Sequence, residues 1–232
     1  MNYKLYEVGG KVRDELMRRQ SDDVDYIVVV DETIPATEAF ETLHSKLKED
    51  GFIVFSMKQD HWTIRSKFPK DHPIYPKLTA DFQLAVKDGF TCDLESNLAQ
   101  RDFTINAMAK DVLTGEIVDP FDGKQHLKDR ILHRVGFDTF TSDPIRVIRA
   151  LRLSMTHQLR IGDDVIRGIG DLLSHHVKNI DSNRLQREVA KMFKYDTRLA
   201  LVRMNDLYRW NFFVWNRVFE ILRLNPIVNK GQ

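Results

Sequence analysis

Two aspartates, Asp23 and Asp25, stand at the start of a β-branched run and could bind a divalent cation. The run, residues 26–30 (Tyr-Ile-Val-Val-Val), predicts a buried strand. Because side chains alternate along a strand, both aspartates would lie on one face of it. Two such carboxylates repel each other unless a cation lies between them, and their oxygen atoms suit Mg²⁺, which also binds phosphates. The spacing therefore predicts a magnesium site at the edge of a sheet.

A glycine turn, Gly9-Gly10, precedes these aspartates and could bind phosphate groups. Paired glycines let the backbone approach a ligand closely and leave N–H groups facing anionic oxygens, and a helix start favours negative charge. We expect a short helix over residues 15–19. A Gly-Gly pair alone is usually a plain turn, and an Asp-rich loop is usually solvated. Together, at this spacing and before a buried strand, they favour a phosphate-binding turn facing a metal site.

Further polar residues follow on two later segments. Asp81 lies within a predicted strand, residues 78–86, and is a candidate third carboxylate. If residues 101–109 form a helix or helix entry, Arg101, Asp102 and Asn106 project toward a common surface. Asn and Asp hydrogen-bond to hydroxyls and Arg forms paired hydrogen bonds with phosphate, so this group suits a ribose and its phosphates.

The segment from residue 142 to residue 152 predicts a helix with an arginine ridge. Ser142 or Asp143 is a suitable N-cap, and Pro144 is favoured in the first turn. Three arginines recur every third residue: Arg146, Arg149 and Arg152. Such a ridge is often only a solvated face. Arginine without lysine, however, favours planar recognition of phosphates or base edges.

The remaining pattern predicts an α+β fold. A helix is expected over residues 37–50 and strands over residues 52–55 and 62–64, and the chain is helical from residue 142 onward. The aromatic-rich segment 207–219 is consistent either with the core of a helix bundle or with base stacking. We therefore expect a small mixed sheet with helices, followed by an all-helical part.

Composition and charge narrow the class of protein. The 232 residues contain 42% hydrophobic and 30% charged residues, typical of a globular protein, and Cys92 is the single cysteine. No disulfide within the chain, zinc cluster, membrane helix or signal peptide is expected, which favours the cytoplasm. Residues 1–123 hold 15 Lys and Arg against 23 Asp and Glu, whereas residues 124–232 hold 20 against 11. This asymmetry favours cations on the first part and a polyanion on the second.

These motifs together resemble class II tRNA nucleotidyltransferases, which are the CCA-adding enzymes, and the related bacterial poly(A) polymerases. The matching stretches, in the family's order from about residue 5 to residue 195, are Gly9-Gly10-Lys11-Val12-Arg13-Asp14, Asp23-Val24-Asp25, Arg101-Asp102-Phe103-Thr104-Ile105-Asn106-Ala107, Ser142-Asp143-Pro144-Ile145-Arg146 and Arg184-Leu185-Gln186-Arg187-Glu188. The Asp-x-Asp motif alone is common to many nucleotidyltransferases, but the ordered set is specific.

The resemblance implies a role for each matching position. Asp23 and Asp25 would bind two Mg²⁺ ions, and Asp81 would orient or deprotonate the 3′-hydroxyl of the RNA. Nucleotide-binding roles are implied for Gly9, Gly10, Arg13, Arg101, Asp102, Asn106, Asp143, Arg146 and Arg149. Among these, Gly10 and Arg13 would contact the triphosphate. Asp143 and Arg146 would read the Watson–Crick edge of C or A, with Arg149 in support.

The implied activity is template-independent addition of C, C and A from CTP and ATP to the 3′ end of tRNA. The implied domains are a catalytic head (1–141), a helical neck that selects the nucleotide (142–200) and the start of a helical body (201–232). The chain departs from the family pattern in two places: Ser142 replaces the usual Glu, which bears on the helix entry but not on the two reading residues, and the stretch between Gly89 and Arg101 is short, which keeps CC addition alone open. A chain ending at Gln232 predicts a minimal or truncated form. The motifs are also compatible with a poly(A) polymerase, a noncatalytic RNA-binding module or a small-molecule nucleotidyltransferase.

Overall fold

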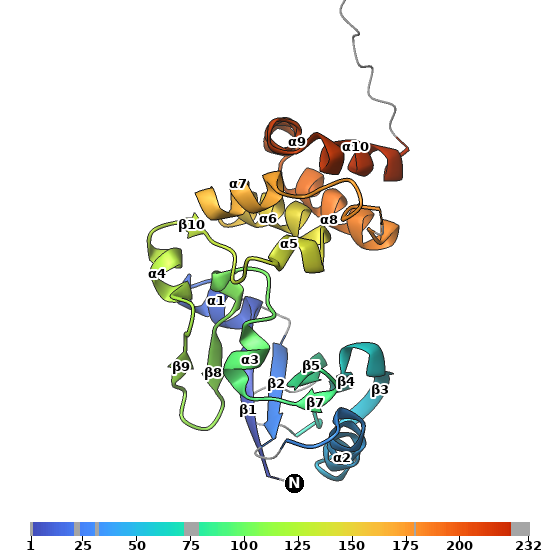
Figure 1. The fold of residues 1–232 in the computed structure, drawn as a ribbon. Helices are drawn as coiled ribbons and strands as arrows, with labels where there is room; N and C mark the ends of the chain where they lie inside the picture. The colour runs from blue at the N-terminus through green and yellow to red at the C-terminus, as the bar shows by residue number, and fades with distance from the viewer. Residues whose placement is uncertain (1, 21–23, 31–32, 72–78, 179, 224–232) are drawn as a thin grey trace, which may run out of the picture. The chain divides into compact units, whose positions relative to one another are not determined.

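The chain forms two compact units, residues 1–127 and 128–232. The computed structural model describes residues 2–20, 24–30, 33–71, 79–178 and 180–223. A multi-stranded sheet with helices makes up the first unit, and helices dominate the second (Figure 1). The α+β prediction is confirmed. The division into a head (1–141), a neck (142–200) and a body (201–232) concerns function and stays a prediction.

The first unit contains short helices and strands. Its strands are β1 (Tyr3–Val8), β2 (Val24–Val30), β3 (Ile53–Lys58), β4 (Thr63–Lys67), β5 (Thr79–Leu84), β6 (Val86–Lys87), β7 (Phe90–Thr91), β8 (Ala109–Asp111) and β9 (Ile117–Val118). Its helices are α1 (Gly10–Leu16), α2 (Ala36–Glu49), α3 (Leu94–Leu98) and α4 (Gly123–Lys128), with 3₁₀ turns at Gln59–His61 and Thr104–Asn106.

The main sheet has the strand order β3-β4-β5-β2-β1-β8-β9 among the described residues. Strands β2 and β5 pair in parallel, and the other neighbouring strands pair antiparallel, so the sheet is mixed as predicted. In the parallel pair Asp25 is aligned with Asp81. This alignment brings together two residues that are far apart in the sequence.

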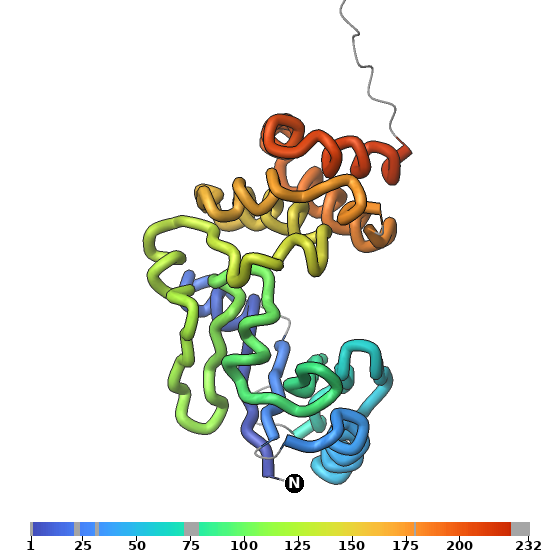
Figure 2. Tube along the Cα trace, in the orientation of Figure 1, coloured from blue at the N-terminus to red at the C-terminus, as the bar shows by residue number. Residues whose placement is uncertain are grey.

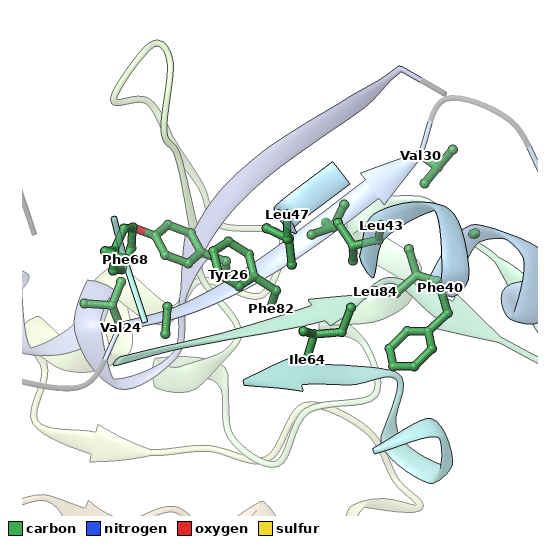
Figure 3. Packing of buried hydrophobic residues seen from close by; sticks show 13 residues of the cluster. Val24, Tyr26, Val30, Phe40, Leu43, Leu47, Ile64, Phe68, Phe82 and Leu84 are labelled. Carbon is green, nitrogen blue, oxygen red and sulfur yellow. The ribbon is translucent and has the colours of Figure 1, made fainter. Parts of the chain in front are cut away.

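A hydrophobic core between α2 and one face of the sheet determines which face the aspartates occupy. Val24, Tyr26 and Val28 alternate along β2 with residues of the opposite face, and they pack with Phe82 and Leu84 of β5 (Figure 3). Burying each such apolar side chain contributes roughly 1.5–3 kcal/mol. Because successive side chains of a strand point to opposite faces, Asp25 and Asp81 lie on the face away from this core.

The local structure differs in detail from the sequence-based expectations at two places. The first helix spans Gly10–Leu16 rather than residues 15–19, because Gly9 takes a φ of 67° and its carbonyl accepts the Arg13 N–H at 3.2 Å. Residues 101–109 form no α-helix: Phe103 is extended, and its N–H donates to the Asp102 carboxylate at 2.8 Å. An Asp side chain that binds the adjacent backbone competes with helix formation, so only a 3₁₀ turn follows.

The second unit is built from helices α5 (Thr139–Ser142), α6 (Ile145–Thr156), α7 (Asp163–Gly170), α8 (Ser182–Tyr195), α9 (Thr197–Trp210) and α10 (Phe212–Ile221). Figure 2 shows its trace, yellow to red, coiled almost throughout. The expected all-helical part also contains β11 (Arg160–Ile161), which pairs in parallel with β10 (Ile131–Leu132). In the described residues, no helix is long and apolar enough to cross a bilayer.

The helix expected at Ser142 starts three residues later. Ser142 ends α5, and Asp143 is extended, with φ −150° and ψ 95°. The Asp143 carboxylate then accepts the Ile145 N–H at 3.3 Å as α6 begins. Asp143 therefore serves the start of the helix as predicted, whereas Ser142 belongs to the preceding one.

The aromatic-rich segment 207–219 lies on α9 and α10. The aliphatic residues Leu207, Val214 and Val218 are buried in the bundle. Phe212 and Phe213 are about half exposed, at 49% and 51%. The helix core is therefore mainly aliphatic, and some of the rings lie at the surface.

Asp93 caps α3, the helix that leads into Arg101. Its carboxylate accepts the Ser96 N–H and hydroxyl, both at 2.8 Å, and the Ser96 N–H hydrogen bond lowers the pKa of Asp93. We expect Asp93→Ala to lower the unfolding free energy at pH 7 by about 1 kcal/mol. Since the lowered pKa makes the carboxylate stabilising only when ionised, this difference should shrink as the pH falls below about 4. Urea unfolding at pH 7 and pH 3 measures both values, and an equal loss at the two pH values would contradict the capping role.

Candidate functional site

Three charged side chains lie in a row across strands β4, β5 and β2. Arg65 is the Cα partner of Asp81, and Asp81 is the partner of Asp25. The Arg65 guanidinium donates from Nε to Asp81 Oδ1 at 2.6 Å and from Nη2 to Oδ2 at 2.5 Å. Asp25 is exposed to solvent. The structure thus brings together two of the three predicted carboxylates, together with an arginine that the sequence analysis did not select.

A second group, which is buried, connects α1 with the 3₁₀ turn. Arg13 donates from Nη1 to Asn106 Oδ1 at 2.6 Å, and from Nε to Asp14 at 2.9 Å. Asn106 Nδ2 in turn donates to Asp102 Oδ1 at 3.0 Å. Arg13, Asp102 and Asn106 are each at most 9% exposed. The two motifs, separated by 93 positions, therefore meet in one network of charged and amide groups.

The glycine turn lies against this network. Arg101 donates from Nη1 to the backbone oxygen of Asn106 at 3.2 Å, and the same nitrogen would lie 3.0 Å from a Cβ added at Gly9. Gly9 also has a positive φ of 67°, which L side chains rarely adopt. The backbone conformation therefore favours a glycine here, and the absence of a Cβ leaves room for the Arg101 guanidinium.

The donor set of the first unit fits a divalent cation such as Mg²⁺. Asp25 supplies hard carboxylate oxygens, and Asp81 adds a negative charge from the adjacent, aligned position. Asp23, the other predicted ligand, lies outside the described residues. Within the described part of the chain, no group of three or more His, Cys, Asp or Glu side chains is placed to hold a metal ion. Asp25 is thus the predicted ligand that the structure describes, and Asp81 is the carboxylate aligned with it on the adjacent strand.

The predicted base-reading residues lie in the second unit, at the start of α6. Asp143 Oδ2 accepts a hydrogen bond from Arg184 Nη2 at 2.7 Å. This carboxylate is therefore held by a residue of α8. Arg146 Nη1 lies 3.3 Å from the Thr139 carbonyl oxygen and 3.4 Å from the Ser142 hydroxyl. The Asp143 side chain is thus held by α8, and the Arg146 side chain by α5.

The arginine ridge of α6 is only partly a surface feature. Arg152 donates to Glu188 Oε2 at 2.6 Å, and the Glu188 side chain is 9% exposed. Arg149 is half-buried on the same helix. The Arg-x-x-x-Glu motif places Arg184 and Glu188 one turn apart on α8, where they contact Asp143 and Arg152 respectively. Through these two contacts the motif holds α8 against Asp143, which precedes α6, and against Arg152, which lies near the end of α6.

Three residues with direct contacts to the predicted site were not selected from the sequence: Arg65, Asp14 and Arg184. Arg65 alternates with Ile64 and Ser66, both buried, so strand periodicity alone could have placed it on the outer face. Its pairing with Asp81 depends on strand order, which the sequence does not display. Asp14 and Arg184 both belong to quoted motifs, although the sequence analysis assigned them no role, and the partner of Arg184 lies 41 positions away.

The mixed sheet with its helices, the aligned carboxylates of β2 and β5 and the glycine turn against the Arg13–Asn106 network are typical of a nucleotidyltransferase head. The model of the poly A polymerase head domain matches residues 5–133, and the chain belongs to this family. The multifunctional CCA protein of Pseudoalteromonas atlantica is 31% identical over 214 residues, covering 84% of this chain and 46% of that protein. The resemblance stated from the motifs is thereby confirmed.

Two further comparisons agree. The CCA-adding enzyme of Staphylococcus epidermidis is 25% identical over 235 residues, covering 96% of this chain and 54% of its own length. A solved tRNA nucleotidyltransferase, in complex with a primer tRNA and an incoming ATP analogue, has a TM-score of 0.69 and 26% identity, covering 95% and 59% of the two chains. The chain thus spans about half the length of the curated relatives it matches.

Proposed function

We propose that this protein is a tRNA nucleotidyltransferase that adds C, C and A to the 3′ end of tRNA, using CTP and ATP and releasing pyrophosphate. The observation that carries the proposal is the buried contact between Arg13 and Asn106, 2.6 Å long, which joins the glycine-turn motif to the Arg-Asp-x-x-x-Asn motif. Family membership and the CCA-adding relatives support the same assignment.

In the proposed reaction the 3′-oxygen of the RNA attacks the α-phosphorus of the nucleotide. A new P–O bond forms, the bond to the β-phosphate breaks, and pyrophosphate leaves with the electron pair. Asp81 accepts the hydrogen bond, and then the proton, of the attacking hydroxyl. Mg²⁺ held by Asp25 and Asp23 would stabilise charge on the attacking and leaving oxygens.

The other groups bind and orient the substrates. The backbone N–H groups of Gly9 and Gly10 face the triphosphate, and Arg101 contributes positive charge beside them. Asp102 and Asn106 bind the ribose. Because every nitrogen of the Arg13 guanidinium already donates to Asp14 or Asn106, we assign Arg13 to orienting Asn106 in addition to attracting phosphate.

The base is selected in the second unit. The Asp143 carboxylate accepts from the exocyclic amino group that cytosine and adenine share, and Arg146 donates to ring acceptors. Arg149 supports Arg146 or the phosphates. Uracil and guanine present a carbonyl oxygen where cytosine and adenine present the amino group, so a fixed carboxylate disfavours them.

Sizing the products on tRNA that lacks its terminal CCA tests this proposal. CTP alone should extend the RNA by two residues, CTP with ATP by three, and UTP or GTP by none. Extension by two residues even with ATP present would restrict the activity to CC addition, and long A tails would reassign the protein as a poly(A) polymerase. Absence of incorporation with every nucleotide, in protein that is folded by circular dichroism, would refute the proposal and favour a noncatalytic RNA-binding module.

A further inference from the structure

The pairing of Arg65 with Asp81 has a geometry that fixes the carboxylate. Each oxygen of Asp81 accepts one guanidinium N–H, at 2.6 Å and 2.5 Å, from a residue directly across the strand pair. Such paired hydrogen bonds set both the position and the plane of a carboxylate. The Arg65 side chain is 53% exposed and that of Asp81 25%, so the pair adds little to stability. Its main effect is therefore on orientation.

The strand order places Asp81 between a guanidinium and a second carboxylate. Asp81 has Arg65 on one side and Asp25 on the other. The two hydrogen bonds use one lone pair on each oxygen and fix the plane of the carboxylate, so Asp81 cannot turn toward a cation at Asp25, whereas a substrate hydroxyl can approach the remaining lone pairs. Arg65 stands directly across from Asp81, whereas Asp25 lies one strand further away, so the two aligned carboxylates have different surroundings.

We propose that Arg65 is a positioning residue that keeps Asp81 out of the metal's ligands and holds it as the acceptor for the 3′-hydroxyl of the RNA. This inference rests on the proposed function and extends it by separating the tasks of the carboxylates. Asp25, with Asp23, serves the cation. Asp81 accepts the hydrogen bond of the attacking hydroxyl, and its position is set by the paired hydrogen bonds from the Arg65 guanidinium on β4.

Manganese binding tests the inference without relying on turnover. Mn²⁺ affinity is measured by electron paramagnetic resonance, with a non-hydrolysable CTP analogue, in wild type, Asp25→Asn, Asp81→Asn, Arg65→Gln and the double variant Arg65→Gln/Asp81→Asn. Asp25→Asn should weaken binding by at least about 10–100-fold, the loss typical of even an outer partner of a metal site. Asp81→Asn should change it by less than about threefold, because the change alters only a partly screened charge.

The arginine variants separate geometry from charge. Arg65→Gln should tighten Mn²⁺ binding by about tenfold, since the released Asp81 adds a carboxylate that can bind the cation. The double variant should lose that gain. Arg65→Lys, which keeps the charge but not the fork, should tighten binding to a similar extent as Arg65→Gln. With tRNA, Arg65→Gln should lower kcat and leave the KM for CTP unchanged.

Two outcomes would overturn the inference alone. One is that Asp81→Asn weakens Mn²⁺ binding as strongly as Asp25→Asn, which would make Asp81 a ligand. The other is that the tightening by Arg65→Gln persists in the double variant. That result would mean that Arg65 weakens Mn²⁺ binding only through its positive charge and not by holding Asp81. Unchanged binding in Asp25→Asn would instead remove the metal site of the proposed function, and the inference with it. Thermal unfolding of each variant confirms that all are folded.

Discussion

Asp25→Asn is expected to abolish nucleotide transfer while leaving the fold intact. Asp25 is exposed on the face of β2 that points away from the hydrophobic core, so the change removes no packing. It does remove a proposed metal ligand that contributes several kcal/mol of transition-state stabilisation, which corresponds to a loss of about 10³-fold or more in kcat. Single-turnover incorporation of CMP into tRNA lacking its CCA end measures the effect.

A matched control separates this effect from a general loss of surface charge. Asp60→Asn removes one negative charge from an exposed position in the 3₁₀ turn Gln59–His61 of the same unit. We expect its rate to stay within about twofold of wild type, because an exposed, distant charge is screened by salt. Turnover by Asp25→Asn at a rate comparable to that of Asp60→Asn would show that the metal assignment is wrong.

Asn106→Leu is expected to have the largest effect on stability. Asn106 receives a charge-assisted hydrogen bond from Arg13 and donates one to Asp102, all within a buried group. Hydrogen bonds to charged groups contribute about 1.5–3 kcal/mol, and leaving such groups unpaired costs at least as much, so we expect a loss of about 3 kcal/mol in unfolding free energy. CTP binding, followed by calorimetry, should weaken in parallel, because the same residues orient the ribose contacts.

Asn106→Asp provides a control that changes only one of the two contacts. The introduced carboxyl can still accept from Arg13, but its second oxygen faces the carboxylate of Asp102. The repulsion raises the pKa of one member of this pair, so the variant is destabilised when both are ionised. Its stability deficit relative to wild type should therefore shrink as the pH falls through that raised pKa. A deficit independent of pH, or none in Asn106→Leu, would contradict the network.

Much of the fold could be predicted because the signals are local. The β-branched run of β2 and the apolar spacing of α2 determine these elements from adjacent residues alone. The Asp181 cap of α8, which accepts the Arg184 N–H at 2.7 Å, is equally local. Where local and longer-range effects compete, prediction was less accurate. Residues 101–109, which were considered as a helix or helix entry, contain only a 3₁₀ turn, because Asp102 binds the adjacent backbone and Asn106 is held by Arg13.

The candidate site could be predicted as a set of residues but not as an arrangement. Asp25 and Asp81 were both selected, yet their direct alignment follows from the parallel pairing of β2 with β5. The paired hydrogen bonds from Arg65 to Asp81 and the contact between Arg184 and Asp143 likewise depend on which elements become neighbours. Such contacts are made across strands and helices, and composition and spacing carry no information about them.

Release of pyrophosphate from CTP tests the central claim most directly. The reaction contains the chain, Mg²⁺, CTP and tRNA that ends before CCA, with the same tRNA carrying a 3′-deoxy end as the matched control. The proposed function predicts two pyrophosphates released per tRNA with the natural end and none with the 3′-deoxy end, because the 3′-hydroxyl is the nucleophile. Release from neither RNA, or equal release from both, would contradict transfer to the 3′ end of tRNA.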